Sequence, residues 1–148
     1  MLRVGTGRAL TVVGGDITIV DGVLAAPGGR LQVASVAAPG DVRFNALTLA
    51  PDLQVDGFAR LGLMQLQGAA FSVSGLGGGA VRIWGGHLQA DRASMLANTF
   101  GPVAGVSLAV DLQITGRIDL HASDIGTIVT DTTSASVSGG TSGCRQRP

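Results

Sequence analysis

The sequence contains no lysine and no glutamate, so its ten basic residues are all Arg and its ten acidic residues are all Asp. Lysine and glutamate are strong helix formers and common on helix surfaces, whereas Asp competes with the backbone for hydrogen bonds and favours turns. Their absence therefore disfavours helix along the whole chain.

Aromatic residues and a net charge are also missing. Aromatics make up 3% of the chain, Trp84 is the single tryptophan, tyrosine is absent, and the formal net charge is zero. Nucleic-acid binding proteins usually carry a basic surface and aromatic side chains on which bases stack. We therefore expect no nucleic-acid partner and no attraction to an anionic membrane surface.

Cys144 is the single cysteine, which excludes a disulfide within the chain. It has no nearby base or helix N-terminus that would make it reactive. No apolar run approaches the roughly 20 residues of a membrane-spanning helix, and the first residues show no signal-peptide pattern. We expect no membrane span, and an export signal, if there is one, outside this segment.

Glycine is abundant, with 24 residues, and it separates short apolar segments that alternate with small or polar residues. The alternation is clearest between residues 10 and 42, where the pairs Leu10/Val12, Ile17/Ile19 and Leu31/Val33 each place one face inward. We therefore predict an all-β chain, with the strands Ala9–Val13, Asp16–Val20, Val23–Ala26, Arg30–Val36, Asp41–Leu49, Leu53–Val55, Phe58–Leu66, Ala80–Trp84, Gly86–Ala90, Gly105–Thr115 and Arg117–Ala122.

A unit of two glycines followed by an alternating strand recurs at irregular spacing. It reads GGDITI at 14–19, GGRLQV at 28–33, GGAVRI at 78–83 and GGHLQA at 85–90. Hairpins of a β-sandwich would more often use Asn-Gly or Asp-Gly turns, which occur here only at Asp21-Gly22 and Asp56-Gly57. Stacked coils tolerate irregular spacing because insertions are absorbed in the corners, so the pattern favours a solenoid over a meander.

The string of corners resembles that of filamentous haemagglutinin-like exoproteins, which are large proteins of bacterial two-partner secretion systems. The resemblance covers roughly residues 9–130 and is carried by GGDI, APGG, VAAPGDV, SVSGLGGG and ANTFG. It implies a right-handed parallel β-helix, a secreted or cell-surface location and an adhesive role. It also implies contact with cell-surface carbohydrate or protein receptors, and export of the parent exoprotein by an outer-membrane transporter.

We therefore predict one right-handed parallel β-helix domain over residues 1–130, with about five or six coils of roughly 20–30 residues each, and an unstructured polar tail over residues 131–148. The predicted function is structural or adhesive contact without catalysis, cofactor or metal. Two alternatives stay open. A carbohydrate-active β-helix enzyme would need carboxylates clustered on one lateral face, and a self-stacking filament module would use uncapped ends for end-to-end association.

The residues that suggest chemistry each have a structural interpretation beside the functional one. The run Gly75–Gly79 lacks the Lys-Ser/Thr of a phosphate-binding loop and is interpreted as a corner. Asp119 and His121 lie two apart on a predicted strand and share a face, where they form a candidate carboxylate–imidazole pair or a solvated outer surface. Asp124 lies close to them in the sequence, and we expect coiling to bring Asp111 and Asp131 near them.

Three further sets complete the candidates. Asp52, Asp56 and Arg60 are a candidate acid pair with an arginine, although corner residues account for them better. Trp84, next to Gly85-Gly86 and His87, is predicted to be an exposed or half-buried corner residue with a possible contact role. Asn98-Thr99 is predicted to form a turn whose Asn amide bonds between coils.

Overall fold

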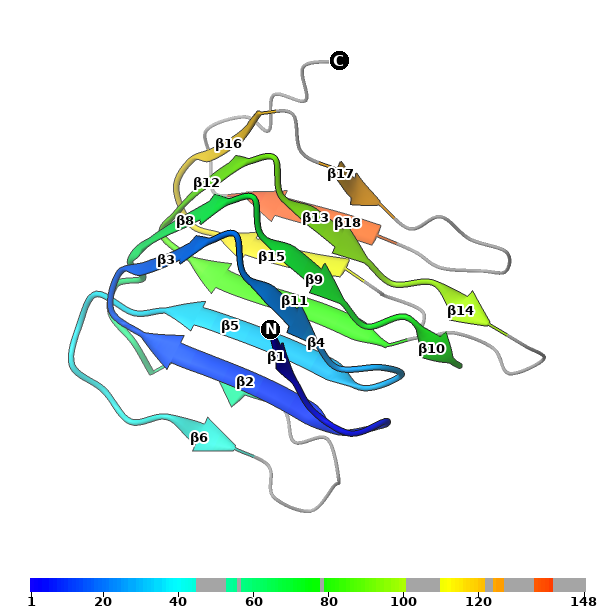
Figure 1. Cartoon of the computed structure of the whole chain (residues 1–148). Coiled ribbons are helices and arrows are strands. Elements are labelled where there is room, and N and C mark those ends of the chain that lie inside the picture. Colours follow the sequence, from blue (N-terminus) through cyan, green and yellow to red (C-terminus); the bar gives the residue numbers. More distant parts are fainter. Residues whose placement is uncertain are drawn as a thin grey trace.

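The computed structural model describes residues 1–44, 53–55, 57–77, 79–100, 110–121, 124–126 and 135–139. Within these residues every regular element is a β-strand, so the all-β prediction is confirmed (Figure 1). The strands are β1 Leu2–Arg3, β2 Ala9–Gly14, β3 Ile17–Val20, β4 Val23–Ala25, β5 Arg30–Ser35, β6 Arg43–Phe44, β7 Leu53–Gln54, β8 Leu63–Gln67, β9 Ala70–Ser72, β10 Gly75–Leu76, β11 Ala80–Gly85, β12 His87–Asp91, β13 Ser94–Leu96, β14 Thr99–Phe100, β15 Val110–Ile114, β16 Ile118–His121, β17 Asp124–Gly126 and β18 Ala135–Gly139.

Three parallel sheets contain most of these strands. Sheet A has the order β1-β4-β9-β13-β17, sheet B the order β2-β5-β11-β15-β18, and sheet C the order β3-β8-β12-β16. The chain visits sheets A, B and C in turn, and each visit adds one strand beside the previous one. We define a pass as three consecutive strands in this order; the first pass is β1, β2 and β3, and the second is β4, β5 and β8.

The hydrophobic core lies between the three sheets and is built from columns of register partners. In sheet B, Leu31 pairs with Val81, and Val81 with Val110; all three side chains are fully buried. Sheets A and C contribute similar columns, and the inward residues predicted for β2, β3 and β5 all belong to or pack against this core. The period-two alternation of the sequence therefore identified the inner face correctly.

Glycine fills corners where successive passes touch backbone to backbone. A Cβ atom on Gly29 would collide with the carbonyl oxygen of Arg8, and one on Gly79 would collide with the carbonyl oxygen of Gly29. At another corner, Gly86 lies in the same way against Leu61, and Gly116 against Gly86. Only glycine allows this approach without displacing the backbone.

The irregular spacing of the double-glycine unit follows from the sheet order. GGRLQV and GGAVRI lead into β5 and β11, which are neighbours in sheet B, whereas GGDITI and GGHLQA lead into β3 and β12 of sheet C. The unit therefore precedes two different sheets; the steps from 14 to 28 and from 28 to 78 run between passes, and the short step from 78 to 85 lies within one pass.

A long excursion leaves the second pass after β5 and returns before β8. Its ends are held together by an antiparallel bridge between Val36 and Leu61 and by a hydrogen bond from the Ala37 N–H to the Arg60 carbonyl, at 2.9 Å. The described part of this excursion includes the antiparallel pair β6–β7. It lies over the outer face of sheet B, where the N–H of Leu53 donates to Gln32 Oε1 at 2.7 Å.

The prediction for Trp84 was wrong. Trp84 is buried, with 7% of its surface exposed, in a second hydrophobic cluster with Ala34, Leu53 and Val55. Trp84 lies on the outer side of β11, since its neighbour Ile83 faces the core. The excursion covers that outer side, which alternation within a single strand does not reveal.

Several predicted segments differ in extent from the observed strands. Of the predicted strand Asp41–Leu49, the structure describes β6, and residues 45–49 lie outside the described residues. Of Phe58–Leu66, only β8 is strand. Six observed strands were not predicted: β1, β9, β10, β13, β14 and β17. Strand β18 lies within the segment predicted as a tail and pairs in parallel with β15.

Candidate functional site

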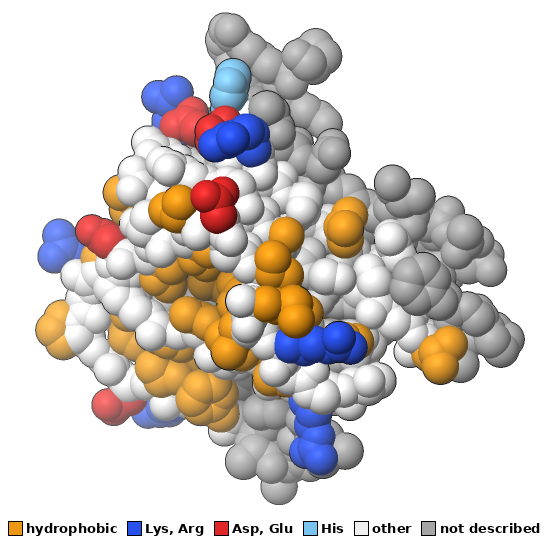
Figure 2. All heavy atoms as spheres, in the orientation of Figure 1, with side chains coloured by type: hydrophobic (Ala, Val, Ile, Leu, Met, Phe, Trp, Pro, Cys, Tyr) orange, Lys and Arg blue, Asp and Glu red, His pale blue; other side chains and the backbone are white. Residues whose placement is uncertain are grey.

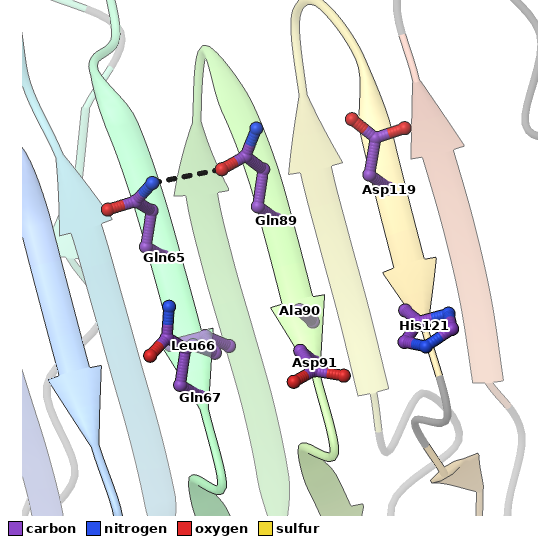
Figure 3. Close-up of a pocket in the computed structure, with 8 residues that line it drawn as sticks. All are labelled: Gln65, Leu66, Gln67, Gln89, Ala90, Asp91, Asp119 and His121. Carbon is purple, nitrogen blue, oxygen red and sulfur yellow. Dashed lines mark hydrogen bonds between the residues drawn. The ribbon is translucent and has the colours of Figure 1, made fainter.

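The outer face of sheet C carries two rows of polar side chains across β8, β12 and β16. One row contains Gln65, Gln89 and Asp119, which are register partners on neighbouring strands. The other row contains Gln67, Asp91 and His121. We call these six residues the polar face. They line a hollow of about 200 Å³, together with Leu66 and Ala90, which lie between them on β8 and β12 (Figure 3).

Strand alternation places these side chains outward. Their sequence neighbours Met64, Leu66 and Leu88 point into the core and are 0%, 1% and 0% exposed. Successive side chains of a strand point to opposite faces, and neighbouring strands lie about 4.8 Å apart. The polar face is therefore a regular lattice of hydrogen-bonding groups on a rigid sheet.

An amide ladder connects two of the strands. Gln65 Nε2 donates to Gln89 Oε1 at 2.9 Å, and Figure 3 shows this bond linking β8 to β12. A glutamine side chain has two N–H donors and two acceptor lone pairs. One such bond leaves both side chains with capacity to bind a ligand.

Charges on and beside the polar face are balanced. Asp119 contacts Arg117 through Oδ1 and the ring Nε2 of His87 through Oδ2, the latter at 3.2 Å. Asp91 contacts Arg92 at 3.4 Å. Figure 2 shows acidic, basic and histidine side chains gathered together near β12 and β16. The local charge is close to neutral, so the polar face suits an uncharged polar ligand better than a polyanion or a polycation.

The structure places Asp119 and His121 on one outer face, as predicted, and Ile118 and Leu120 on the core side. The imidazole that contacts Asp119, however, belongs to His87, which comes from the neighbouring strand. Sequence spacing within β16 suggested His121 as the partner. The cross-strand contact depends on register, which the spacing did not provide.

Two of the other acidic candidates lie on strands of other sheets. Asp111 lies on β15 of sheet B, where it is 8% exposed and accepts a hydrogen bond from Gln113 Nε2 at 2.9 Å. The prediction that coiling brings it near Asp119 was therefore wrong. Asp124 is on β17 of sheet A. Asp131 lies outside the described residues.

The remaining candidates that the structure describes lie where successive passes meet or where the excursion leaves the stack. Of the predicted corner Gly75–Gly79, Gly75 and Leu76 form strand β10, which pairs with β14. Gly75 and Gly79 lie against the backbone of Gly28 and Gly29. Arg60 lies where the two ends of the excursion meet, since its carbonyl accepts from the Ala37 N–H. Asp52, Asp56 and Cys144 lie outside the described residues.

The Asn98 side-chain oxygen does not bond between passes as predicted, since Oδ1 is buried without a hydrogen-bond partner. The backbone makes these contacts instead: the Asn98 N–H donates to Ser74 Oγ at 3.0 Å, and its C=O accepts from the Gly75 N–H at 3.0 Å.

Sequence reasoning did not single out Gln65, Gln67, Gln89 and Asp91. The signal was present in the segments MQLQ at 64–67 and HLQAD at 87–91, where polar residues alternate with core residues. Among the described residues, no group of three or more His, Cys or Asp side chains is placed to hold a metal ion. The described residues also contain no helix with the length and apolarity of a membrane span.

Comparisons with protein-family models, with curated proteins and with solved structures find no match to this chain.

Proposed function

We propose that the chain is a right-handed parallel β-helix segment of a secreted surface exoprotein of the filamentous haemagglutinin type, and that it works as a stiff scaffold making contact through an exposed face. The observation that carries this proposal is the repeated A, B, C order of parallel strands in register. Such stacking buries a continuous core and leaves long lateral faces free for binding. On this proposal the parent protein reaches the cell surface through an outer-membrane transporter.

The polar face is the surface to which we assign the contact. Its amides and carboxylates offer donors and acceptors at strand spacing, and its charges are balanced by Arg92 and Arg117. A neutral polysaccharide, with hydroxyl groups that both donate and accept, matches this chemistry. Binding would rest on many modest hydrogen bonds, each contributing about 0.5–1.5 kcal/mol net.

Binding of the purified chain to immobilised neutral and acidic polysaccharides tests this function. We expect binding to a neutral polysaccharide that changes little between low and high salt, because charge attraction contributes little. The variant Gln67→Ala/Gln89→Ala should bind at least about tenfold more weakly, which corresponds to the loss of about 1.4 kcal/mol.

The matched control is Ser72→Ala/Ser94→Ala, which removes polar groups from strands β9 and β13 of sheet A and should leave binding unchanged. Binding that prefers acidic polysaccharides and disappears in salt would contradict the assignment to the polar face. An equal loss in both variants would do the same, because it would show that the contact is not confined to sheet C.

A further inference from the structure

Strand β3 extends the outer face of sheet C by one strand beyond the polar face. Its residues Thr18 and Val20 are exposed, whereas Ile17 and Ile19 pack against the core. Thr18 is the register partner of Gln65 on β8, and Val20 is the partner of the next outward residue on that strand. Each row of the polar face therefore continues onto β3, one with a hydroxyl group and the other with an apolar side chain.

One row of this face carries a hydrogen-bonding side chain on all four strands of sheet C. We call it the continuous row; it contains Thr18, Gln65, Gln89 and Asp119. The row of Gln67 is interrupted at β3 by Val20, and the row of His87 is interrupted at β8 by Leu63. A ligand that crosses the strands therefore meets hydrogen-bonding groups at each step only along the continuous row.

The two glutamine amides of the continuous row are oriented in the same direction. Gln65 Nε2 donates to Gln89 Oε1 at 2.9 Å, and Figure 3 shows the side-chain oxygen of Gln65 on the side away from Gln89. That side faces β3 and Thr18, because β8 lies between β3 and β12. Gln89 Nε2 is a donor on the side that does not face Gln65, and Asp119 on β16 is the next residue of the row.

This orientation creates two positions for a ligand hydroxyl group, one on each side of the amide bond. Between Thr18 and Gln65, a ligand hydroxyl can donate to Gln65 Oε1 while it accepts from the threonine hydroxyl. Between Gln89 and Asp119, a ligand hydroxyl can accept from Gln89 Nε2 and donate to the carboxylate. The two positions are two strand spacings apart, which is about 10 Å at about 4.8 Å a step.

The carboxylate of Asp119 is held in place for this role. Its Oδ2 contacts His87 Nε2 at 3.2 Å, and its Oδ1 contacts Arg117. An ionised carboxylate has about four acceptor sites, so these two contacts leave capacity for a ligand hydroxyl. The side chain is 36% exposed, which makes it accessible to a ligand. An acceptor that is already oriented loses little further freedom when a ligand binds.

Resting on the proposed function, we propose that the continuous row selects an extended, β-linked linear polysaccharide and binds it across the strands, along the direction in which the passes stack. In a cello-type chain each sugar is turned over relative to the previous one, so equivalent hydroxyl groups recur at every second sugar. That repeat matches the two hydroxyl positions, which lie about 10 Å apart. An α-linked malto-type chain coils, so its equivalent hydroxyls do not stay on one flat side.

Titration calorimetry of the full chain with cello- and malto-oligosaccharides tests this selection, because both series consist of glucose and differ only in linkage. We expect cellotetraose to bind at least about tenfold more tightly than cellobiose, which is too short to fill both positions. Maltotetraose should show no such gain over maltose. Equal affinity for the two tetrasaccharides would overturn the inference and leave the proposed function standing. Absence of cellotetraose binding would also overturn it, and the immobilised polysaccharides then show whether the proposed function fails as well.

Two variants test the hydroxyl positions separately. Thr18→Val keeps the side-chain shape and removes the hydroxyl, and Asp119→Ala removes the carboxylate at the other position; circular dichroism checks that both variants fold. Each should weaken cellotetraose binding about fivefold, and cellobiose binding by no more than about twofold, because cellobiose can use the remaining position. Ser72→Ala, on β9 of sheet A, is the control and should change neither affinity. Unchanged cellotetraose binding in Thr18→Val would overturn the proposed direction, because a polysaccharide that followed β8 would not reach β3.

Discussion

The carbonyl oxygen of Arg8 occupies the space that a side chain on Gly29 would need. Because both positions are backbone, neither can move away cheaply. We predict that Gly29→Ala lowers the free energy of unfolding by about 1–3 kcal/mol, the usual cost of overpacking. Gly15→Ala is the control, since a Cβ there has no atom within 4 Å, and it should be neutral or slightly stabilising. Urea denaturation distinguishes the two, and equal effects would argue against the stacked corners.

The columns of the core predict that truncating a core side chain destabilises the fold less in the first pass than in the second. Val33 is fully buried and Val12, its partner in the first pass, is half-buried. Val33→Ala should cost about 2 kcal/mol through the loss of two buried methyl groups and the cavity that remains. Val12→Ala should cost roughly half as much, because its side chain is half-buried. Equal costs in urea titrations would show that the first pass is covered within the single chain.

Trp84 reports directly on the excursion, because it is the single tryptophan. Its indole N–H donates to Gln113 Oε1 at 3.1 Å, and its ring packs beside Leu53 and Val55. We predict blue-shifted fluorescence that acrylamide quenches weakly. Val55→Ala should increase quenching by opening the cover, whereas Val23→Ala, a change on β4 of sheet A, should not. Emission typical of free tryptophan in the native chain would contradict this packing.

The polar face should matter more for binding than for stability. Gln65 and Gln89 are linked by a solvent-exposed hydrogen bond, and exposed pairs contribute little to folding. We predict that Gln65→Ala and Gln89→Ala each change the free energy of unfolding by less than about 1 kcal/mol, with a coupling of about 0.5 kcal/mol in a double-mutant cycle. A loss of several kcal/mol would show that the ladder is part of the core instead.

Much of the fold could be predicted from local sequence. Alternation identified the inward residues of β2, β3 and β5, and the double glycines marked corners, because both signals depend only on neighbouring residues. The burial of Trp84 could not be predicted in the same way. Its cover comes from Leu53 and Val55, which lie about 30 residues earlier in the chain, within the excursion.

Prediction of the candidate site from local sequence is limited in the same way. Alternation within β16 placed Asp119 and His121 on one outer face, and the structure agrees. The contact between His87 and Asp119 and the rows of the polar face arise from register between strands 24 to 32 residues apart. Register is set by how passes stack, so a single strand carries no information about it.

Parallel stacking in this register is the central claim, and engineered disulfides measure it most directly. Thr18 and Gln65 are register partners on β3 and β8, at a spacing of about 4.8 Å that a disulfide can span. In a Cys144→Ser background, Thr18→Cys/Gln65→Cys should form an intramolecular disulfide on mild oxidation. Thr18→Cys/Gln89→Cys, whose positions are separated by β8, should not. Efficient bridging of the second pair with none in the first would contradict the stacking order.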